Sequence, residues 1–232
     1  MRFRDVDPQY LSLYPYYGRH AQDRFLHEHV FGDLRNGVFV DIGAYDGVES
    51  SNTLFFEESL GWNGICIEPL PNIFSKLVIN RKCHCINKCA LDRYTNGQFF
   101  HVIPDRKKDV AIQGRRSNIE KLSGLTEYST KLHQQMIDKK IQEVGGAIEY
   151  FEVECVPINT LLSVVKTKID LLSLDTEGSE LQILQAIDFD QFNIDVIVVE
   201  DLFSDAALGH FMKAKKYTYV KTIGYDSIYI KK

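Results

Sequence analysis

Four short apolar segments, each followed by an acidic residue, recur along the chain and restrict its fold more than any other feature. The segments are rich in β-branched and aromatic residues, which is typical of buried strands. They cover residues 38–40, 65–67, 169–174 and 194–199, and they are followed by Asp41, Glu68, Asp175 and the pair Glu200 and Asp201. Segments with helical spacing lie between them. Apolar strands that alternate with helices predict an α/β, Rossmann-like fold with a mostly parallel sheet and helices on both faces.

Three further strands are expected at the edges of this sheet. Residues 217–222 and 227–230 are separated by a short Gly-containing connection, which favours an antiparallel hairpin at one edge. A third apolar strand is expected at 85–87, and residues 98–103 are expected to add a strand beside it. The whole chain, 1–232, is therefore interpreted as a single domain.

A glycine-rich turn follows the first strand, and it favours close approach of the backbone to a nucleotide-like ligand. Gly43 and Gly47 punctuate this turn, but Tyr45 occupies the place of the middle glycine of the dinucleotide fingerprint G-x-G-x-x-G. The side chain of Tyr45 would crowd a pyrophosphate, whereas Asp41 suits a ligand with a cationic amino group, such as S-adenosylmethionine. An ordinary turn of a doubly wound fold is the alternative interpretation.

Glu68 lies about twenty residues beyond the glycine-rich turn, at the end of the second strand. An acid at this place accepts hydrogen bonds from the ribose hydroxyls of an adenosine group. NAD-binding folds place an acid in the same way, so an NAD-dependent oxidoreductase is a competing function, which Tyr45 disfavours. Ligands of open α/β sheets bind at the carboxyl ends of the strands. We therefore expect the acids that follow the four strands to meet in one crevice.

Composition limits the partners and the cellular location. The formal net charge of −5 gives no general reason to expect a nucleic-acid partner. The five cysteines are odd in number and lie mostly within apolar runs, which favours reduced thiols. No apolar run approaches the ~20 residues of a membrane span, and the first ten residues lack the apolar core of a signal peptide. A soluble, cytoplasmic protein is expected.

Two segments interrupt the regular alternation. Residues 1–21 are read as an N-terminal arm, and residues 104–150 as an insertion. Nine Lys and Arg residues against six Asp and Glu residues make 105–146 locally basic. The insertion is either a solvated excursion or a substrate cap, in which Arg115 and Arg116 would be available to an anionic or hydroxyl-rich acceptor.

Three stretches of the sequence together resemble the FkbM family of S-adenosylmethionine-dependent methyltransferases. They are DIGAYDGVESSNTLFFEESLGWNGICIEPLPNIF, the pair Asn80 and Arg81, and DLLSLDTEGSELQIL. The similarity runs from about Gln22 to the final strand. It implies a class I methyltransferase fold, with a seven-stranded sheet whose last strand is reversed. It also implies a cofactor site made by Asp41, Gly43, Ala44, Tyr45, Gly47, Ser51, Asn52, Glu68, Ala90 and Leu91.

The resemblance further implies an O-methyltransferase that acts on a hydroxyl of a sugar, a glycan or a glycosylated metabolite. Asp175 occupies the position that such enzymes present to the acceptor, and Asp175 or Glu177 could remove the hydroxyl proton. Alternatively, Asp175, Glu200 and Asp201 could hold Mg²⁺ or Mn²⁺, which would lower the pKa of the acceptor hydroxyl. A non-catalytic adaptor that keeps the fold is a third possibility, and the oligomeric state stays open.

Overall fold

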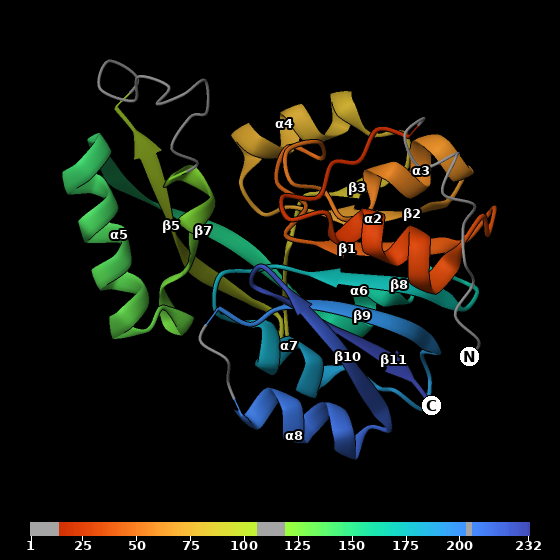
Figure 1. Ribbon diagram of the computed structural model, residues 1–232. Coiled ribbons are helices and arrows are strands. Elements are labelled where there is room, and N and C mark those ends of the chain that lie inside the picture. Colours follow the sequence, from red (N-terminus) through yellow and green to blue (C-terminus); the bar gives the residue numbers. More distant parts are fainter. Residues whose placement is uncertain (1–13, 106–118, 203–205) are drawn as a thin grey trace.

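The computed structural model describes residues 14–105, 119–202 and 206–232, so Arg115 and Arg116 lie outside the described residues. Its main feature is a seven-stranded sheet in the order β3-β2-β1-β8-β9-β11-β10 (Figure 1). The strands are β1 (Val38–Ile42), β2 (Asn63–Ile67), β3 (His84–Ile86), β8 (Ile169–Leu174), β9 (Ile194–Glu200), β10 (Tyr217–Ile223) and β11 (Asp226–Lys231).

The direction of the strands gives the sheet a defined switch point. Strands β3, β2, β1, β8 and β9 are parallel neighbours, whereas β11 pairs antiparallel with both β9 and β10. The expected closing hairpin is therefore present, and the last strand is the reversed one. From β1 the chain proceeds outward to β2 and β3 on one side, and returns to β8 and β9 on the other. A crevice at the carboxyl ends of β1 and β8 is thus the place where this topology binds ligands.

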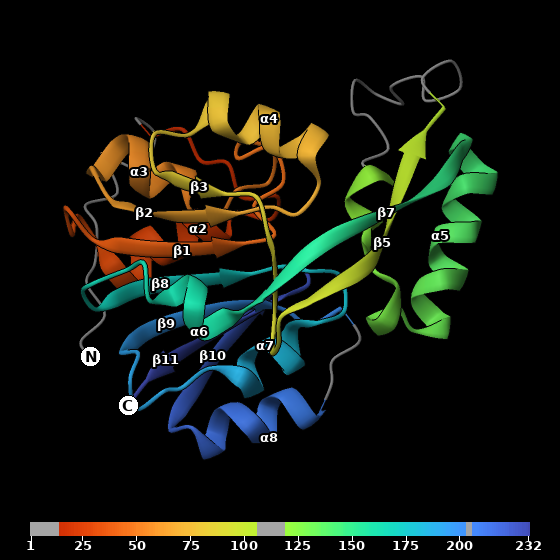
Figure 2. The ribbon, with the colours of Figure 1, turned by 180° about the vertical axis from the view of Figure 1, so that it is seen from behind.

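Helices cover both faces of the main sheet, as Figures 1 and 2 show from opposite sides. One face packs against α2 (Gln22–Leu26), the π-helical turn η1 (His27–Phe31), α3 (Leu54–Leu60) and α4 (Pro71–Asn80). The other packs against α6 (Ile158–Leu162), α7 (Glu180–Ala186) and α8 (Ala206–Ala214). Because apolar side chains point to both faces of the central strands, each face has its own core. No helix among the described residues is both long and apolar enough to cross a membrane.

A second, four-stranded sheet corrects one expectation. The segment expected to extend the main sheet forms β5 (Thr95–Pro104), which instead pairs antiparallel with β7 (Gly146–Pro157) along its whole length. The sheet has the order β4-β7-β5-β6, with β4 (Cys89–Leu91) and β6 (Gly124–Leu125). Packing explains why β5 lies outside the main sheet, because its Phe100 and Val102 form a separate core with residues of the insertion.

The insertion folds against this long hairpin. It contains the 3₁₀ turns η2 (Ile119–Leu122) and η3 (Thr126–Tyr128) and the helix α5 (Lys131–Val144). The hairpin β5–β7 and α5 form a lobe beside the main sheet (Figures 1 and 2). The Oγ1 atom of Thr130 caps the start of α5 by accepting a hydrogen bond from the backbone N–H of His133 at 3.1 Å.

Candidate active site

One pocket lies at the carboxyl ends of the parallel strands. An acid that follows each of the four apolar strands contributes to its wall, namely Asp41, Glu68, Asp175 and Glu200, whereas Asp201 is not part of the lining. The insertion adds Glu120 and Lys121, and the N-terminal arm adds Arg19 and His20. The crevice expected from the sequence is therefore present, and two segments outside the main sheet line it as well.

The glycine-rich turn holds the strand ends together at close range. The backbone N–H groups of Gly43 and Ala44 both donate to the carbonyl oxygen of Ile67, at 3.0 Å. Gly43 has a φ of +80°, and a Cβ atom on it would lie 1.6 Å from the carbonyl oxygen of Asp175. Only glycine fits at this point, because the ends of β1 and β8 leave no room for a side chain.

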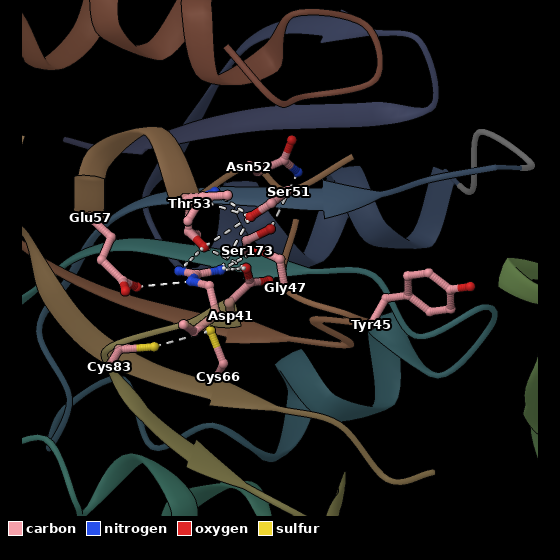
Figure 3. A network of polar contacts seen from close by, with 12 residues as sticks. Asp41, Tyr45, Gly47, Ser51, Asn52, Thr53, Glu57, Cys66, Cys83 and Ser173 are labelled. Carbon is pink, nitrogen blue, oxygen red and sulfur yellow. Dashed lines mark hydrogen bonds and ion pairs between the residues drawn. The ribbon is translucent and has the colours of Figure 1, made fainter. Parts of the chain in front are cut away.

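Tyr45 directs its side chain toward the insertion. Its φ of +50° is the left-handed conformation, which is uncommon for a residue other than glycine. The phenol donates a hydrogen bond to Oε2 of Glu120 at 2.8 Å, and the ammonium of Lys121 lies 5.1 Å from the ring centre. Figure 3 shows the Tyr45 side chain extending away from the polar network around Asp41. The ring therefore forms part of the pocket wall next to the insertion, on the side away from that network.

Glu68 is held by the backbone through both carboxylate oxygens. Oε2 accepts from the N–H of Tyr45 at 3.1 Å, and Oε1 accepts from the N–H of Leu70 at 2.9 Å. Burial nevertheless raises the pKa of Glu68 to about 8, because the low-dielectric surroundings penalise the charged form more than the two N–H groups favour it. A ligand whose hydroxyl groups donate hydrogen bonds to this carboxylate would offset the free energy that its desolvation costs.

Asp41 belongs to a buried polar network, part of which is drawn in Figure 3. The hydroxyl of Thr53 donates to Oδ2 of Asp41 at 2.6 Å, and Nη1 of Arg81 lies 3.8 Å from the same oxygen. Arg81 also donates to Oε2 of Glu57 at 2.9 Å and to the hydroxyl of Thr53 at 2.9 Å. Desolvation raises the pKa of Asp41, and the guanidinium of Arg81 opposes this shift. The network fixes the carboxylate at the base of the glycine-rich turn.

Three acidic side chains gather at the other end of the pocket. One carboxylate oxygen each from Asp175, Glu177 and Glu200 lies within 4.8 Å of the others. The side chain of Asp175 is exposed to the pocket, whose walls shield it from bulk solvent, and this desolvation together with the nearby Asp226 raises its pKa to about 7. Desolvation also raises the pKa values of Glu177 and Glu200, and the neighbouring Asp175 adds to both shifts.

These three carboxylates could hold a divalent cation. Oxygen ligands of Mg²⁺ lie about 2.1 Å from the ion and therefore about 3–4 Å from one another. The group differs at one position from the ligand set expected from the resemblance, because Glu177 takes the place of Asp201. Glu177 reaches the group from a turn in which its φ is +57°.

The sequence of the chain also matches a known protein family. Residues 41–220 match the sequence model of the methyltransferase FkbM domain. The chain belongs to the FkbM methyltransferase family. Its match to this family covers β1 to β10 and so includes all four strand ends that line the pocket.

Several solved methyltransferase structures are similar to this FkbM-family chain. The methyltransferase FkbM from Methylobacillus flagellatus KT has 10% sequence identity and a TM-score of 0.46, over 97% of this chain and 50% of that one. M. capricolum TrmK in complex with S-adenosyl-homocysteine has 12% identity and a TM-score of 0.40, over 91% and 66%. A human methyltransferase 10 domain containing protein has 11% identity and a TM-score of 0.40, over 91% and 78%. The chain thus spans half the length of the first of these structures. No curated protein sequence matches it.

Most of the cofactor residues implied by the FkbM resemblance line the pocket. Those that do are Asp41, Gly43, Ala44, Tyr45, Ser51, Asn52, Glu68 and Ala90. Gly47 and Leu91 do not line it. A Cβ atom on Gly47 would lie 2.6 Å from Cγ of Arg81, so this glycine packs against the arginine network. Leu91 is 1% exposed and lies in the core next to Leu70.

Sequence reasoning missed the roles of Arg81, Lys121 and Asp226. Arg81 was noted as half of a family motif, but nothing in the sequence indicated that it would be buried between Asp41 and Glu57. Lys121 donates to the hydroxyl of Ser50 at 2.8 Å and so ties the insertion to the glycine-rich turn. Asp226, at the start of β11, lines the pocket because the closing hairpin brings it next to the main strand ends.

Proposed function

We propose that this protein is an S-adenosylmethionine-dependent O-methyltransferase whose acceptor is a hydroxyl of a sugar, glycan or glycosylated metabolite. The proposal depends chiefly on one observation, that Asp41, Glu68 and Asp175 line the same pocket around a glycine-rich turn. The FkbM family of the chain supports the reaction class. The resemblance to that family supports a sugar hydroxyl as the acceptor.

The chain's own groups fit the parts of S-adenosylmethionine. Glu68 has both oxygens directed by backbone N–H groups, which suits the two ribose hydroxyls. Asp41 on the pocket wall suits the amino group of the methionine part, and Asn52, which also lines the pocket, could reach its carboxylate. The apolar side of the pocket is made by Leu70, Ala90, Phe99 and Leu125, and it suits a planar base. When bound, the cofactor supplies a methyl group on a sulfonium, ready for displacement by a nucleophile.

The acceptor side requires a group that removes the hydroxyl proton. Asp175 projects into the pocket, and its pKa of about 7 makes it an effective general base near neutral pH. Glu177 lies beside it and is the second candidate. Either carboxylate would orient the hydroxyl by accepting its hydrogen bond, so that the oxygen lies in line with the bond that breaks.

A divalent cation offers a second way to activate the acceptor. Asp175, Glu177 and Glu200 would hold Mg²⁺ or Mn²⁺, which lowers the pKa of a bound hydroxyl. Turnover that falls in EDTA and returns with Mg²⁺ would support this role. Undiminished turnover in the chelator would leave Asp175 or Glu177 as the base.

Titration calorimetry with S-adenosylhomocysteine tests the cofactor assignment. The wild type should bind, and Glu68→Ala and Glu68→Gln should each weaken binding by at least tenfold. Asp190→Ala removes an exposed acid that is far from Glu68 in the sequence. It is the matched control and should bind S-adenosylhomocysteine like the wild type. Absence of binding by the wild type would overturn the proposal. A screen for methyl transfer to a panel of glycans and nucleotide sugars then tests the acceptor class.

A further inference from the structure

Glu177 occupies a turn that needs outside support. This residue has a φ of +57°, and the following Gly178 has a φ of +124°. A left-handed conformation of a glutamate is costly and persists only where its surroundings hold it. Part of the support is local, because Oε1 of Glu180 accepts from the N–H groups of Thr176 at 2.8 Å and of Gly178 at 3.1 Å.

The insertion supplies the remaining support by packing directly on this turn. A Cβ atom on Gly124, in β6, would lie 3.1 Å from the carbonyl oxygen of Glu177. A Cβ atom on Gly178 would lie 2.9 Å from the carbonyl oxygen of Tyr128, in η3. The backbones of the insertion and of the turn therefore approach closely at two places, with a glycine on one side of each.

A buried histidine of the insertion faces the Glu177 carboxyl. His133, in the first turn of α5, is 2% exposed, and its ring packs edge-on against Phe100 at 5.8 Å. Its Nε2 lies 3.5 Å from Oε2 of Glu177. Both atoms are buried, and neither has a hydrogen-bond partner among the described residues. Buried polar atoms without partners are rare, and two that face each other indicate an interaction between them.

The donors and acceptors of the two side chains identify that interaction. The backbone of Leu122 also lies against the ring and favours its protonated form, whereas Nε2 has no hydrogen-bond partner within the described part of the chain. A neutral ring with its proton on Nδ1 presents a lone pair at Nε2, and an ionised carboxylate presents only acceptors. Two acceptors facing each other repel, whereas a single proton between them satisfies both. A movement of a few tenths of an ångström would bring 3.5 Å to hydrogen-bond length.

We propose that His133 is a positioning residue for Glu177: one proton shared between His133 Nε2 and Glu177 Oε2 fixes the carboxyl at the acceptor end of the pocket. The Glu177 carboxyl is then held beside Asp175 and Glu200. The insertion thereby completes the acceptor side of the site rather than only covering it. The catalytic consequence rests on the methyltransferase function proposed above, but the contact itself does not.

Three substitutions at these positions separate hydrogen bonding from packing. His133→Gln keeps a side chain that can donate or accept a hydrogen bond near the place of Nε2, whereas His133→Leu keeps apolar bulk against Phe100 and can do neither. Glu177→Gln changes the other partner. His210→Leu, which replaces an exposed histidine on α8, is the matched control. The two His133 variants and His210→Leu should bind S-adenosylhomocysteine like the wild type, because neither histidine lines the pocket.

The contact is tested without any activity measurement by ¹⁵N NMR of the histidine rings. Glu177→Gln should shift the Nε2 resonance of His133 and leave that of His210 unchanged. Binding of Mn²⁺ to the protein loaded with S-adenosylhomocysteine should weaken about tenfold or more in His133→Leu, as loss of a partner behind a ligand typically does, and by less in His133→Gln. Methyl transfer to an acceptor found in the screen should follow the same order in kcat, with the KM for S-adenosylmethionine unchanged.

The outcomes distinguish the two proposals. Failure of the wild type to bind S-adenosylhomocysteine overturns the proposed function and leaves the NMR result to decide the contact. If the Nε2 resonance of His133 is the same in Glu177→Gln as in the wild type, the proposed contact is overturned. Equal losses of Mn²⁺ binding or kcat in His133→Leu and His133→Gln would mean that the ring acts through packing alone, and this also overturns the positioning role.

Discussion

The carbonyl oxygen of Asp175 lies so close to Gly43 that a Cβ atom on this glycine would be 1.6 Å from it. Because Asp175 N–H also donates to the carbonyl of Ile42 at 3.0 Å, the ends of β1 and β8 are joined on both sides of this contact. The same contact sets the distance between the glycine-rich turn and the acceptor-side acids. Gly43 thus fixes the width of the pocket at the switch point of the sheet.

We therefore expect Gly43→Ala to disrupt the site. The added methyl group must push two backbone segments apart, and the φ of +80° is unfavourable for alanine, so binding of S-adenosylhomocysteine should be lost together with several kcal/mol of stability. Gly209→Ala in α8 is the control, since nothing lies within 4 Å of a Cβ there and the helix should gain about 0.5–1 kcal/mol. Urea unfolding of both variants measures the difference. A Gly43→Ala protein with wild-type stability and binding would contradict the close approach.

Arg81 should be the most costly of the buried charges to remove. It pairs with Glu57 at 2.9 Å and lies 3.8 Å from Asp41, and its side chain is 0% exposed. Arg81→Leu leaves two buried carboxylates without their cation, which typically costs about 3–5 kcal/mol. Arg93→Leu removes an exposed arginine that pairs with Glu127, and it should change stability little. Equal losses in urea unfolding would show that the network around Asp41 contributes nothing beyond a surface ion pair.

Apolar patterning predicted the central strands well, because burial on both faces leaves a plain signal in the sequence. The segments 169–174 and 194–199 coincide with β8 and β9 to within one residue. The common crevice followed from the parallel direction of these strands, since it places all their carboxyl ends at one edge. Patterning does not say which strand pairs with which, and this is why β5 was assigned to the wrong sheet.

The differences between the expected and the observed acidic group have a similar origin. Position after a strand suggested Asp201, which directly follows β9, whereas Glu177 lies in the turn after β8. The Glu177 carboxyl reaches Asp175 and Glu200 from a turn in which Glu177 has a left-handed conformation. The amino-acid sequence carries little information about such a conformation. Arg81 and His133 act across long stretches of sequence, so their partners were visible only in the folded chain.

The pKa of Glu68 predicts how stability depends on pH. Its value of about 8 in the folded protein is raised from an ordinary 4.5, so the folded state holds this proton more tightly than the unfolded chain. The stabilisation is complete below pH 4.5 and is lost as the pH rises through 8. Burial lowers the pKa values of His27 and His133, but this affects stability only below about pH 6.5.

Between pH 6.5 and 8, Glu68 should therefore remove roughly 1–2 kcal/mol of stability from the protein without cofactor. Glu68→Gln cannot ionise and should show a shallower decline over the same interval. Asp138→Asn, at an exposed position of α5, should decline like the wild type. Urea unfolding at three pH values in this window measures the slopes. Identical slopes for the wild type and Glu68→Gln would mean that Glu68 titrates in its ordinary range.

The three-acid group predicts that Glu200→Gln stabilises the protein without metal but abolishes its stabilisation by Mn²⁺. In the absence of metal the crowded carboxylates repel one another, so Glu200→Gln should stabilise the protein, whereas Asp201→Asn, which lies outside the group, should not. At a hundred times the dissociation constant Mn²⁺ should raise the melting temperature of the wild type by roughly 5–10 °C, because binding then contributes about 2.7 kcal/mol. That rise should disappear in Glu200→Gln and in Glu177→Gln and persist in Asp201→Asn. If the rise in melting temperature depends on Asp201 and not on Glu177, the ligand set expected from the sequence is the right one. If Mn²⁺ raises the melting temperature of no variant, the three acids act only as acid–base groups.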